Sequence, residues 1–446
     1  MNNKNNIVNM KKILLTIATA LTVLSAFAQN EIKSVPAATK SLASAKEAVN
    51  NPKKNTKAAT WIKYGQALID AYNAPVGEII VGMGQQELDL IGFKEKAAKE
   101  ENVTLADVDY IKKVYADKDI YFGIGGQVAA IEVTKPIEEN ALALAVEAFS
   151  KAVSIDGGSK TLKDATQGIK SVNEKLNAEA ITEYTLGNLG KSSVCFEKAA
   201  EALAAAPVCA IDTNAVYNAG LTAFMGGDMD RAKLFFQRSM TNNYFGTDGD
   251  VFYKLSVIAD KQNDAEGGKA ILKEGFEKFP QSQSILIGLI NYYVKSGEGA
   301  DELFSLLDKA KKNDPKNASL YYVEGNAYKN LGNMEAAAAA YDKCYDIDPT
   351  YNWGYIGKGM MFYDKAIEYQ ELASQEMDDA KWNELSKKFE VSLKSCIEPF
   401  EKAYELSTDP EIKRTVSEYL KNACFRFRGE SEEYQQKYEK YAAAAE

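Results

Sequence analysis

Apolar positions recur every three or four residues over most of the chain, in pairs of segments separated by a short polar turn. The clearest pair lies between Asn317 and Pro349, with Gly332 at its turn. Bulky and small residues follow one another along it in a fixed order: Tyr321, Gly325, Tyr328, Ala337, Tyr341 and Cys344. Gly325 and Ala337 have almost no side chain, so two helices can approach closely there while the tyrosines fill the remaining space. The pattern predicts two packed helices joined at Gly332, which suits the left-handed conformation that ends a helix.

The turn between paired segments recurs at a nearly constant distance. It falls at Gly190, Gly227, Asn263, Gly297 and Gly332, with gaps of 37, 36, 34 and 35 residues. The period, the turn and the order of bulky and small residues resemble the tetratricopeptide repeat, a unit of about 34 residues built from two helices. One such unit cannot bury its apolar face alone, so neighbouring units stack against it. The resemblance implies an all-α fold, an open right-handed superhelix of helical hairpins.

A segment of different character interrupts the first repeat. Leu68 fits the first helix of a pair, but the matching Ala145 and Phe149 of the partner helix begin 77 residues later. The intervening residues 76–136 contain β-branched and aromatic runs between turn signals. We expect a small antiparallel β-meander standing on the first helix pair. Its extended runs are expected at residues 78–81, 109–116, 120–124 and 127–134.

The first residues have the organisation of a signal peptide. Lys11 and Lys12 precede an apolar run over residues 13–23, and Ala26 and Ala28 form a small-x-small cleavage site. The run is shorter than the roughly 20 residues that span a bilayer. We therefore expect cleavage after Ala28, a periplasmic or secreted protein, and no membrane insertion of the mature chain. The alternative is that the segment stays uncleaved as an anchor.

The predicted parts follow one another along the chain. They are residues 1–28 (signal peptide), 29–75 (N-terminal helices and the first helix of a pair), 76–136 (meander), 137–158 (partner helix), 159–410 (repeat array) and 411–446 (capping helix and a tail that frays at its end). Phe362 and Cys396 lie 34 residues apart, which predicts a lengthened hairpin near residues 355–406. Pro399 is expected to bend its second helix.

Composition excludes several kinds of chemistry. The chain has no histidine, which excludes Ser-His-Asp and Cys-His catalysis and His-ligated zinc. Gly123, Gly125 and Gly126 lack the spacing of a nucleotide-binding loop and are predicted to form turns. Asp228 follows Gly227 and is predicted to cap a helix, because no distal acid completes a calcium loop. We expect no catalytic residue, no cofactor and no metal.

Charge and cysteine content bear on partners and redox state. The formal net charge is −10, and it becomes −13 without residues 1–28, which carry three lysines and no acid. A net anion disfavours nucleic acid and anionic membranes as partners. Of the five cysteines, Cys195, Cys344 and Cys396 occupy small-residue positions of second helices, which predicts buried thiols. Cys396 and Cys424 fall on adjacent predicted helices, and a disulfide between them is left open.

The resemblance implies a function on the inner face of the superhelix, which first helices line. The positions predicted to form a partner-binding groove are Asn214, Tyr217, Leu221, Tyr253, Tyr292, Tyr322, Asn326, Met360 and Tyr363. Tyrosine recurs at one slot of three repeats, and large rigid rings with a polar end suit recognition. The alternative is that these rings pack one helix against another. Only Asn326 matches the Lys and Asn that clamp a carboxylate in chaperone-binding members of the family, so that class of partner is doubtful.

Three functions are compatible with these patterns. The first is a non-enzymatic exported scaffold that binds other envelope proteins or peptides. The second is a glycan-binding or nutrient-capture protein of the outer envelope, against which the content of only three tryptophans argues. The third is a glycosidase with paired carboxylates in a closed helical toroid, which an open chain with distinct caps disfavours. The partner, the surface that binds it and the oligomeric state are left open.

Overall fold

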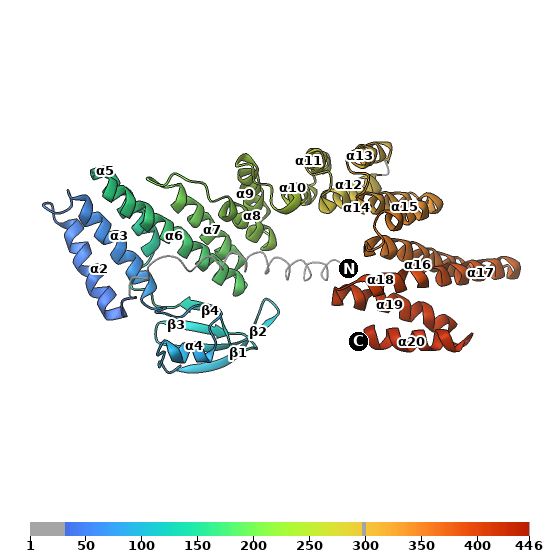
Figure 1. Ribbon diagram of the computed structural model, residues 1–446, viewed down its shortest axis with the longest axis horizontal. Helices are drawn as coiled ribbons and strands as arrows, with labels where there is room; N and C mark the ends of the chain where they lie inside the picture. The colour runs from blue at the N-terminus through green and yellow to red at the C-terminus, as the bar shows by residue number, and fades with distance from the viewer. Residues whose placement is uncertain (1–31, 297–299, 446) are drawn as a thin grey trace. The chain divides into compact units, whose positions relative to one another are not determined.

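The computed structural model describes residues 32–296 and 300–445 as paired helices with one small sheet (Figure 1). The expected signal peptide over residues 1–28 and the predicted turn at Gly297 lie outside the described residues. No helix within the described part is both long and apolar enough to cross a membrane.

The chain forms two compact units, the first ending at Tyr244 and the second beginning at Phe245. The long helices described in the first unit are α2 (Val35–Asn50), α3 (Ala58–Asn73), α5 (Ala141–Ile155), α6 (Ser159–Thr185), α7 (Leu189–Ala204), α8 (Thr213–Met225) and α9 (Met229–Thr241). Helices α3 and α5, α6 and α7, and α8 and α9 pack as pairs. The second helix of one pair also contacts the first helix of the next, so a continuous apolar core runs through this unit.

A small sheet lies between α3 and α5 in the sequence. Its elements are α4 (Gln85–Leu90), β1 (Lys99–Leu105), β2 (Val108–Val114), β3 (Lys118–Phe122) and β4 (Val128–Val133). The four strands pair antiparallel in the order β1-β2-β3-β4. The prediction of a small antiparallel meander is therefore confirmed.

The strand predicted at residues 78–81 is wrong. This segment is a loop that buries Ile79 and covers one end of β4. The Gly82 amide donates to the Val128 carbonyl at 2.7 Å, and the Val128 amide donates to the Met83 carbonyl at 2.8 Å. The first strand is β1 instead, whose polar sequence KEENVTL has no apolar run because it forms an edge of the sheet.

The sheet packs on α6, in the second helix pair, rather than standing on the first pair alone. Tyr121 of β3 and Ala130 of β4 form an apolar cluster with Leu186, directly after α6. Gly187 lies beside Ala106 in the turn between β1 and β2. The insertion is therefore anchored to the repeat that follows it.

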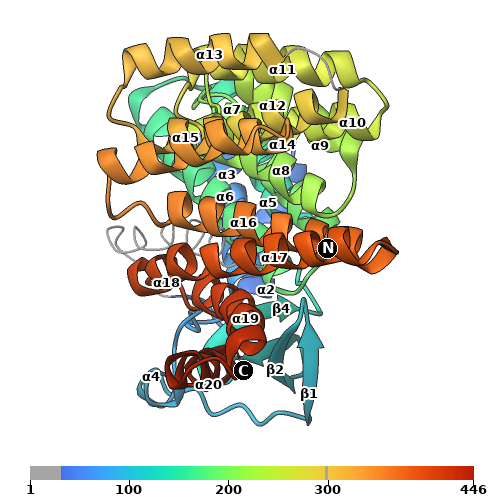
Figure 2. The ribbon, with the colours of Figure 1, turned by 90° about the vertical axis from the view of Figure 1, so that its right-hand side faces the viewer.

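The second unit continues the series of helices. Its described elements are a 3₁₀ turn at Thr247–Gly249, α10 (Asp250–Lys261), α11 (Ala265–Lys278), α12 (Gln283–Ser296), α13 (Ala300–Asn313), α14 (Ala318–Asn330), α15 (Met334–Ile347), α16 (Asn352–Gln375), α17 (Asp379–Ser395), α18 (Ile397–Leu406), α19 (Pro410–Phe427) and α20 (Glu432–Ala445). Helices α10 and α11, α14 and α15, and α16 and α17 pack as pairs, and α19 and α20 lie side by side (Figure 1 and Figure 2).

The long hairpin consists of α16, with 24 residues, and α17, with 17 residues. Its second helix is interrupted, because α18 begins at Ile397 after a break at Cys396. Pro399 has no N–H to donate to the Ser395 carbonyl, and its ring would clash with that carbonyl in a continuous helix, which explains the break. The tail forms the helix α20 through Ala445, and its final residue lies outside the described residues. Tyr441 of α20 is 1% exposed and its hydroxyl donates to Glu401 at 3.1 Å.

The turns within pairs use the left-handed conformation that the sequence predicts. Gly227, Asn263 and Gly332 have φ of 84°, 59° and 76°. The turn predicted at Gly190 is wrong, since α7 begins before that residue and Gly187, with φ of 79°, makes the turn. The predicted cap is present, because the Asp228 side chain accepts a hydrogen bond from the Arg231 amide at 3.0 Å.

Glycines lie directly under aromatic rings where helices of the array meet. A Cβ added to Gly325 would approach the Tyr341 ring to 2.6 Å, and one added to Gly357 would approach the same ring to 2.5 Å. In the first unit, a Cβ on Gly168 would lie 2.3 Å from the Phe149 ring. The aromatic ring of one helix therefore occupies the space that a side chain on its neighbour would need.

We expect Gly325→Ala to destabilise the protein by about 1–3 kcal/mol, because the added methyl group overlaps a fully buried ring. Urea unfolding followed by circular dichroism measures the change. Gly190→Ala is the matched control, since no atom lies within 4 Å of its Cβ position and alanine favours a helix. An unchanged urea midpoint for Gly325→Ala would contradict the close contact.

All five cysteines are free thiols in the structure, including Cys396 and Cys424. Four are buried and Cys209 is exposed. Burial raises the pKa of Cys344 and of Cys396 to about 12 in each case. These thiols remain protonated near neutral pH and behave as small apolar groups, as their positions predict.

In the folded protein at pH 8 we expect one thiol, that of Cys209, to react rapidly with Ellman's reagent. A raised pKa keeps the buried thiols protonated and therefore unreactive at this pH. Addition of guanidinium should expose the other four, for a total of five. A total of three after unfolding would instead indicate a disulfide, and Cys209→Ser provides the control for the rapid phase.

Candidate functional site

The nine predicted groove residues lie on first helices of the pairs, and they fall in both units. Asn214, Tyr217 and Leu221 lie on α8 of the first unit. The others lie on α10, α12, α14 and α16 of the second unit: Tyr253, Tyr292, Tyr322, Asn326, Met360 and Tyr363. We call the surface formed by these four helices the A-helix face of the second unit.

On α8 the predicted residues mainly serve packing. Leu221 is 5% exposed. The ring of Tyr217 contacts Phe236 and Tyr244, with centroid distances of 6.0 Å and 5.4 Å. Asn214 is exposed. The alternative reading, in which the rings pack between helices, therefore describes Tyr217.

In the second unit Tyr322 is the centre of an aromatic cluster. Its ring centroid lies 6.2 Å from those of Tyr341 and Tyr351 and 6.3 Å from that of Trp353. We call these four residues the Tyr322 cluster. Burial raises the pKa of Tyr322 above its ordinary value. Trp353 is 39% exposed, so the cluster has one ring that reaches solvent.

Polar side chains hold the cluster in place. The Tyr341 hydroxyl donates to Asn326 Oδ1 at 2.7 Å. Gln283 Nε2, from α12, donates to the Tyr351 hydroxyl at 2.9 Å. Asn326 therefore orients a buried ring beside Tyr322, whereas its predicted role in a partner-binding groove stays a prediction. Trp353, the exposed member, is absent from the predicted set, although eight aromatic residues between positions 321 and 355 signal this cluster.

The remaining predicted residues do not join the Tyr322 cluster. Tyr292 donates its hydroxyl hydrogen to Glu266 at 2.5 Å. Tyr253 packs beside Gly288 of α12. The Tyr363 ring meets Tyr419 edge to face with centroids 5.0 Å apart, and Met360 lies in the same apolar cluster. These side chains connect neighbouring helices.

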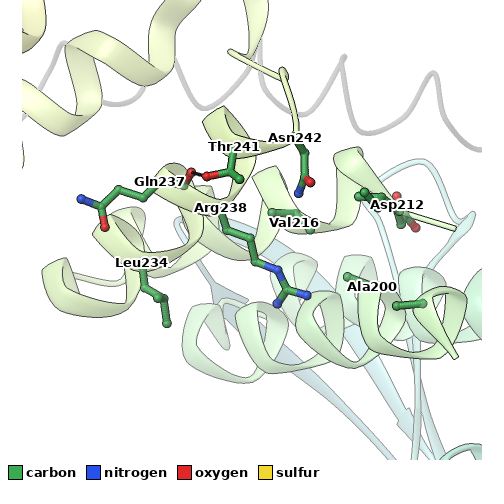
Figure 3. A pocket seen from close by; sticks show the side chains of 10 residues that line it. Ala200, Asp212, Val216, Leu234, Gln237, Arg238, Thr241 and Asn242 are labelled. Carbon is green, nitrogen blue, oxygen red and sulfur yellow. Dashed lines mark hydrogen bonds between the residues drawn. The ribbon is translucent and has the colours of Figure 1, made fainter. Parts of the chain in front are cut away.

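The first unit holds a separate pocket between α7, α8 and α9, with a volume of about 500 Å³ (Figure 3). We call it the α7–α9 pocket. Its lining residues are Ala200, Ala204, Ile211, Asp212, Val216, Leu234, Gln237, Arg238, Thr241 and Asn242. Ile211 and Leu234 are each 59% exposed at its walls. None of the nine predicted residues lines this pocket. The sequence feature that could have indicated this pocket is Leu234, an outward-facing leucine among the charged residues of α9.

Within residues 32–296 and 300–445, no cluster of three or more cysteine or acidic side chains could hold a metal ion. Trp61 Nε1 donates to the Asn55 carbonyl at 2.7 Å, which gives this tryptophan a structural role. The surfaces that remain as candidates are the A-helix face of the second unit and the α7–α9 pocket.

Comparison with known proteins identifies the repeat. Residues 318–351, which contain α14 and α15, match the tetratricopeptide repeat family. Over 97 residues, 22% of this chain, the sequence is 28% identical to the Hsp70-Hsp90 organizing protein of Triticum aestivum. The match spans 16% of that relative's length.

Several solved structures also align with the chain. A TPR repeats protein from Bacteroides fragilis is 17% identical, with a TM-score of 0.24, and the match covers 55% of this chain and 97% of that one. YrrB, a TPR protein described as having an unusual peptide-binding site, is 22% identical with a TM-score of 0.27, over 47% of this chain and 96% of its own. A tetratricopeptide repeat protein from Parabacteroides merdae is 12% identical with a TM-score of 0.34, over 63% of this chain and 92% of its own. The chain thus contains one segment, residues 318–351, that matches the tetratricopeptide repeat family, and this segment lies within its series of helix pairs.

Proposed function

We propose that this protein is a non-enzymatic exported scaffold of the cell envelope, which binds a segment of a partner protein on the A-helix face of its second unit. The partner segment contacts Trp353 and the exposed edge of the Tyr322 cluster. The other predicted groove residues position the helices on which this surface is built. Export rests on the signal-peptide pattern over residues 1–28.

The exposure of Trp353 carries the proposal. A tryptophan that is 39% exposed beside three other aromatic rings offers a large, rigid, partly desolvated surface. Such residues contribute most to protein interfaces, because they bury much apolar area at little cost in side-chain entropy. The neighbouring rings and the Gln283 hydrogen bond hold the site in the shape that it needs for binding.

Two further observations support a binding role. Helix pairs that expose first helices along one side offer an extended surface for a peptide or helix. The wheat relative is named for organizing two other proteins, which is the kind of role proposed here. The net charge of −10 argues against nucleic acid as the partner.

We expect Trp353→Ala to weaken binding of a selected peptide at least tenfold, a loss of about 1.4 kcal/mol. Peptides are selected from a phage-displayed library of random dodecapeptides on the immobilised protein, synthesised with a fluorescent label, and titrated by fluorescence polarisation. The loss follows from removal of the exposed ring, while Tyr322, Tyr341 and Tyr351 keep the helices packed.

Trp382→Ala is the matched control, since this tryptophan is 48% exposed on α17, outside the Tyr322 cluster. Circular dichroism and thermal unfolding establish that both variants are folded. Equal affinity of every selected peptide for Trp353→Ala and for the unchanged protein would refute the site. Binding of polysaccharides in place of peptides would favour the glycan-binding alternative.

A further inference from the structure

A polar contact joins α7 to α9 near the start of α9, and the sequence does not repeat it two helical turns further along. Arg231 Nε donates to Ser193 Oγ at 2.7 Å, and its guanidinium pairs with Glu197 at 2.5 Å. Seven residues are close to two turns of a helix, so residues seven positions further along lie on the same faces. At those positions α9 carries a second arginine, Arg238, but α7 carries Ala200 and Ala204.

Arg238 therefore lies next to a cavity at the position where Arg231 has hydrogen-bond acceptors on α7. Among the described residues, the Arg238 guanidinium makes no hydrogen bond and no ion pair. In Figure 3 its side chain extends from α9 toward α7, at the α7–α9 pocket. The two alanines leave the volume of about 500 Å³ open.

Asp212, which also lines the pocket, is not available to Arg238. Its Oδ1 accepts from the Ala215 amide at 2.9 Å as a helix cap. Its Oδ2 accepts from the side-chain amides of Asn173 and Asn177 at 2.7 Å and 3.1 Å. These three donors hold the carboxylate at the start of α8, so the positive charge of Arg238 is left for a ligand.

We propose that the α7–α9 pocket binds an acidic segment of a partner protein, in which a Leu, Ile or Phe side chain lies next to an Asp or Glu. The apolar side chain covers Ala200, Ala204 and Val216, and the carboxylate pairs with Arg238. The bound segment thus supplies the contact that Glu197 makes with Arg231. This site is separate from the A-helix face, and it stands whether or not Trp353 binds a partner.

The chemistry of the lining selects this occupant. Arg238 is the sole cation among the lining residues, and one guanidinium forms a bidentate pair with one carboxylate. Leu234 and Ile211, each 59% exposed, form apolar walls that favour a hydrocarbon side chain over water. Gln237 and Asn242 at the same pocket offer amide donors to the backbone of an extended segment.

The test uses the purified protein and a phage-displayed library of random dodecapeptides anchored at their C-termini, so that no free terminal carboxylate is present. We expect enriched peptides with Asp or Glu beside Leu, Ile or Phe. Their amidated synthetic forms should lose at least tenfold in affinity with Arg238→Glu, which repels the carboxylate. Ala204→Glu should cause the same loss, because it places a carboxylate within the protein at the position equivalent to Glu197.

Matched controls carry the same charge changes elsewhere. Lys316→Glu and Ala380→Glu alter exposed positions of the second unit and should leave the affinity within twofold. Ala204→Glu should not lower the thermal unfolding temperature, since it adds an ion pair at an exposed position. Trp353→Ala should also leave binding of the acidic peptides unchanged, which separates this site from the one on the A-helix face.

Three results would overturn the proposal. One is enrichment of no acidic peptide. Another is binding within twofold for both Arg238→Glu and Ala204→Glu. The third is acidic peptides whose affinity falls with Trp353→Ala and not with Arg238→Glu.

Discussion

The structure depends on the close approach of helices at glycines that lie under aromatic rings. The Tyr341 ring lies on two of them, Gly325 of its own pair and Gly357 of the next helix. Phe149 likewise lies against Gly65 and Gly168. One ring thus closes a pair and also joins it to its neighbour. This dual contact explains why the core continues from pair to pair instead of ending within each hairpin.

The same constraint limits what the aromatic residues can do on the surface. Tyr217 and Tyr322 recur at one slot of the repeat, yet both rings are engaged with neighbouring helices. A tyrosine that closes the helix packing has little area left for a partner. In the proposed function, recognition falls to Trp353, which lies beside the packed rings and is exposed. On that proposal, packing and binding are divided between adjacent aromatic residues.

The sequence predicted the helix pairs well because helical spacing and left-handed turn residues act locally, as at Gly227 and Gly332. It misplaced the first strand of the sheet because β1 is an edge strand whose polar side chains are paired only in three dimensions, as in the contact of Glu100 with Lys113 at 3.4 Å. Of the residues around the proposed site, the sequence singled out Tyr322 and Asn326 but did not reveal the hydrogen bond from Tyr341 to Asn326. Exposure of Trp353 and the cavity at Arg238 depend on which residues face each other across helices, and sequence spacing on one helix does not reveal that.

The proposed site in the α7–α9 pocket illustrates how an array of helix pairs could present a binding site without a change of fold. Ser193 and Glu197 satisfy Arg231 within the protein, which fixes α7 against α9. Two alanines at the next equivalent positions remove the acceptor but keep the helices, because alanine has the highest helix propensity. The loss costs little stability, since Arg238 is exposed and stays hydrated. A solvated charge beside an apolar cavity can then be neutralised by a ligand at a small desolvation cost, whereas a buried arginine would have required its partner for folding.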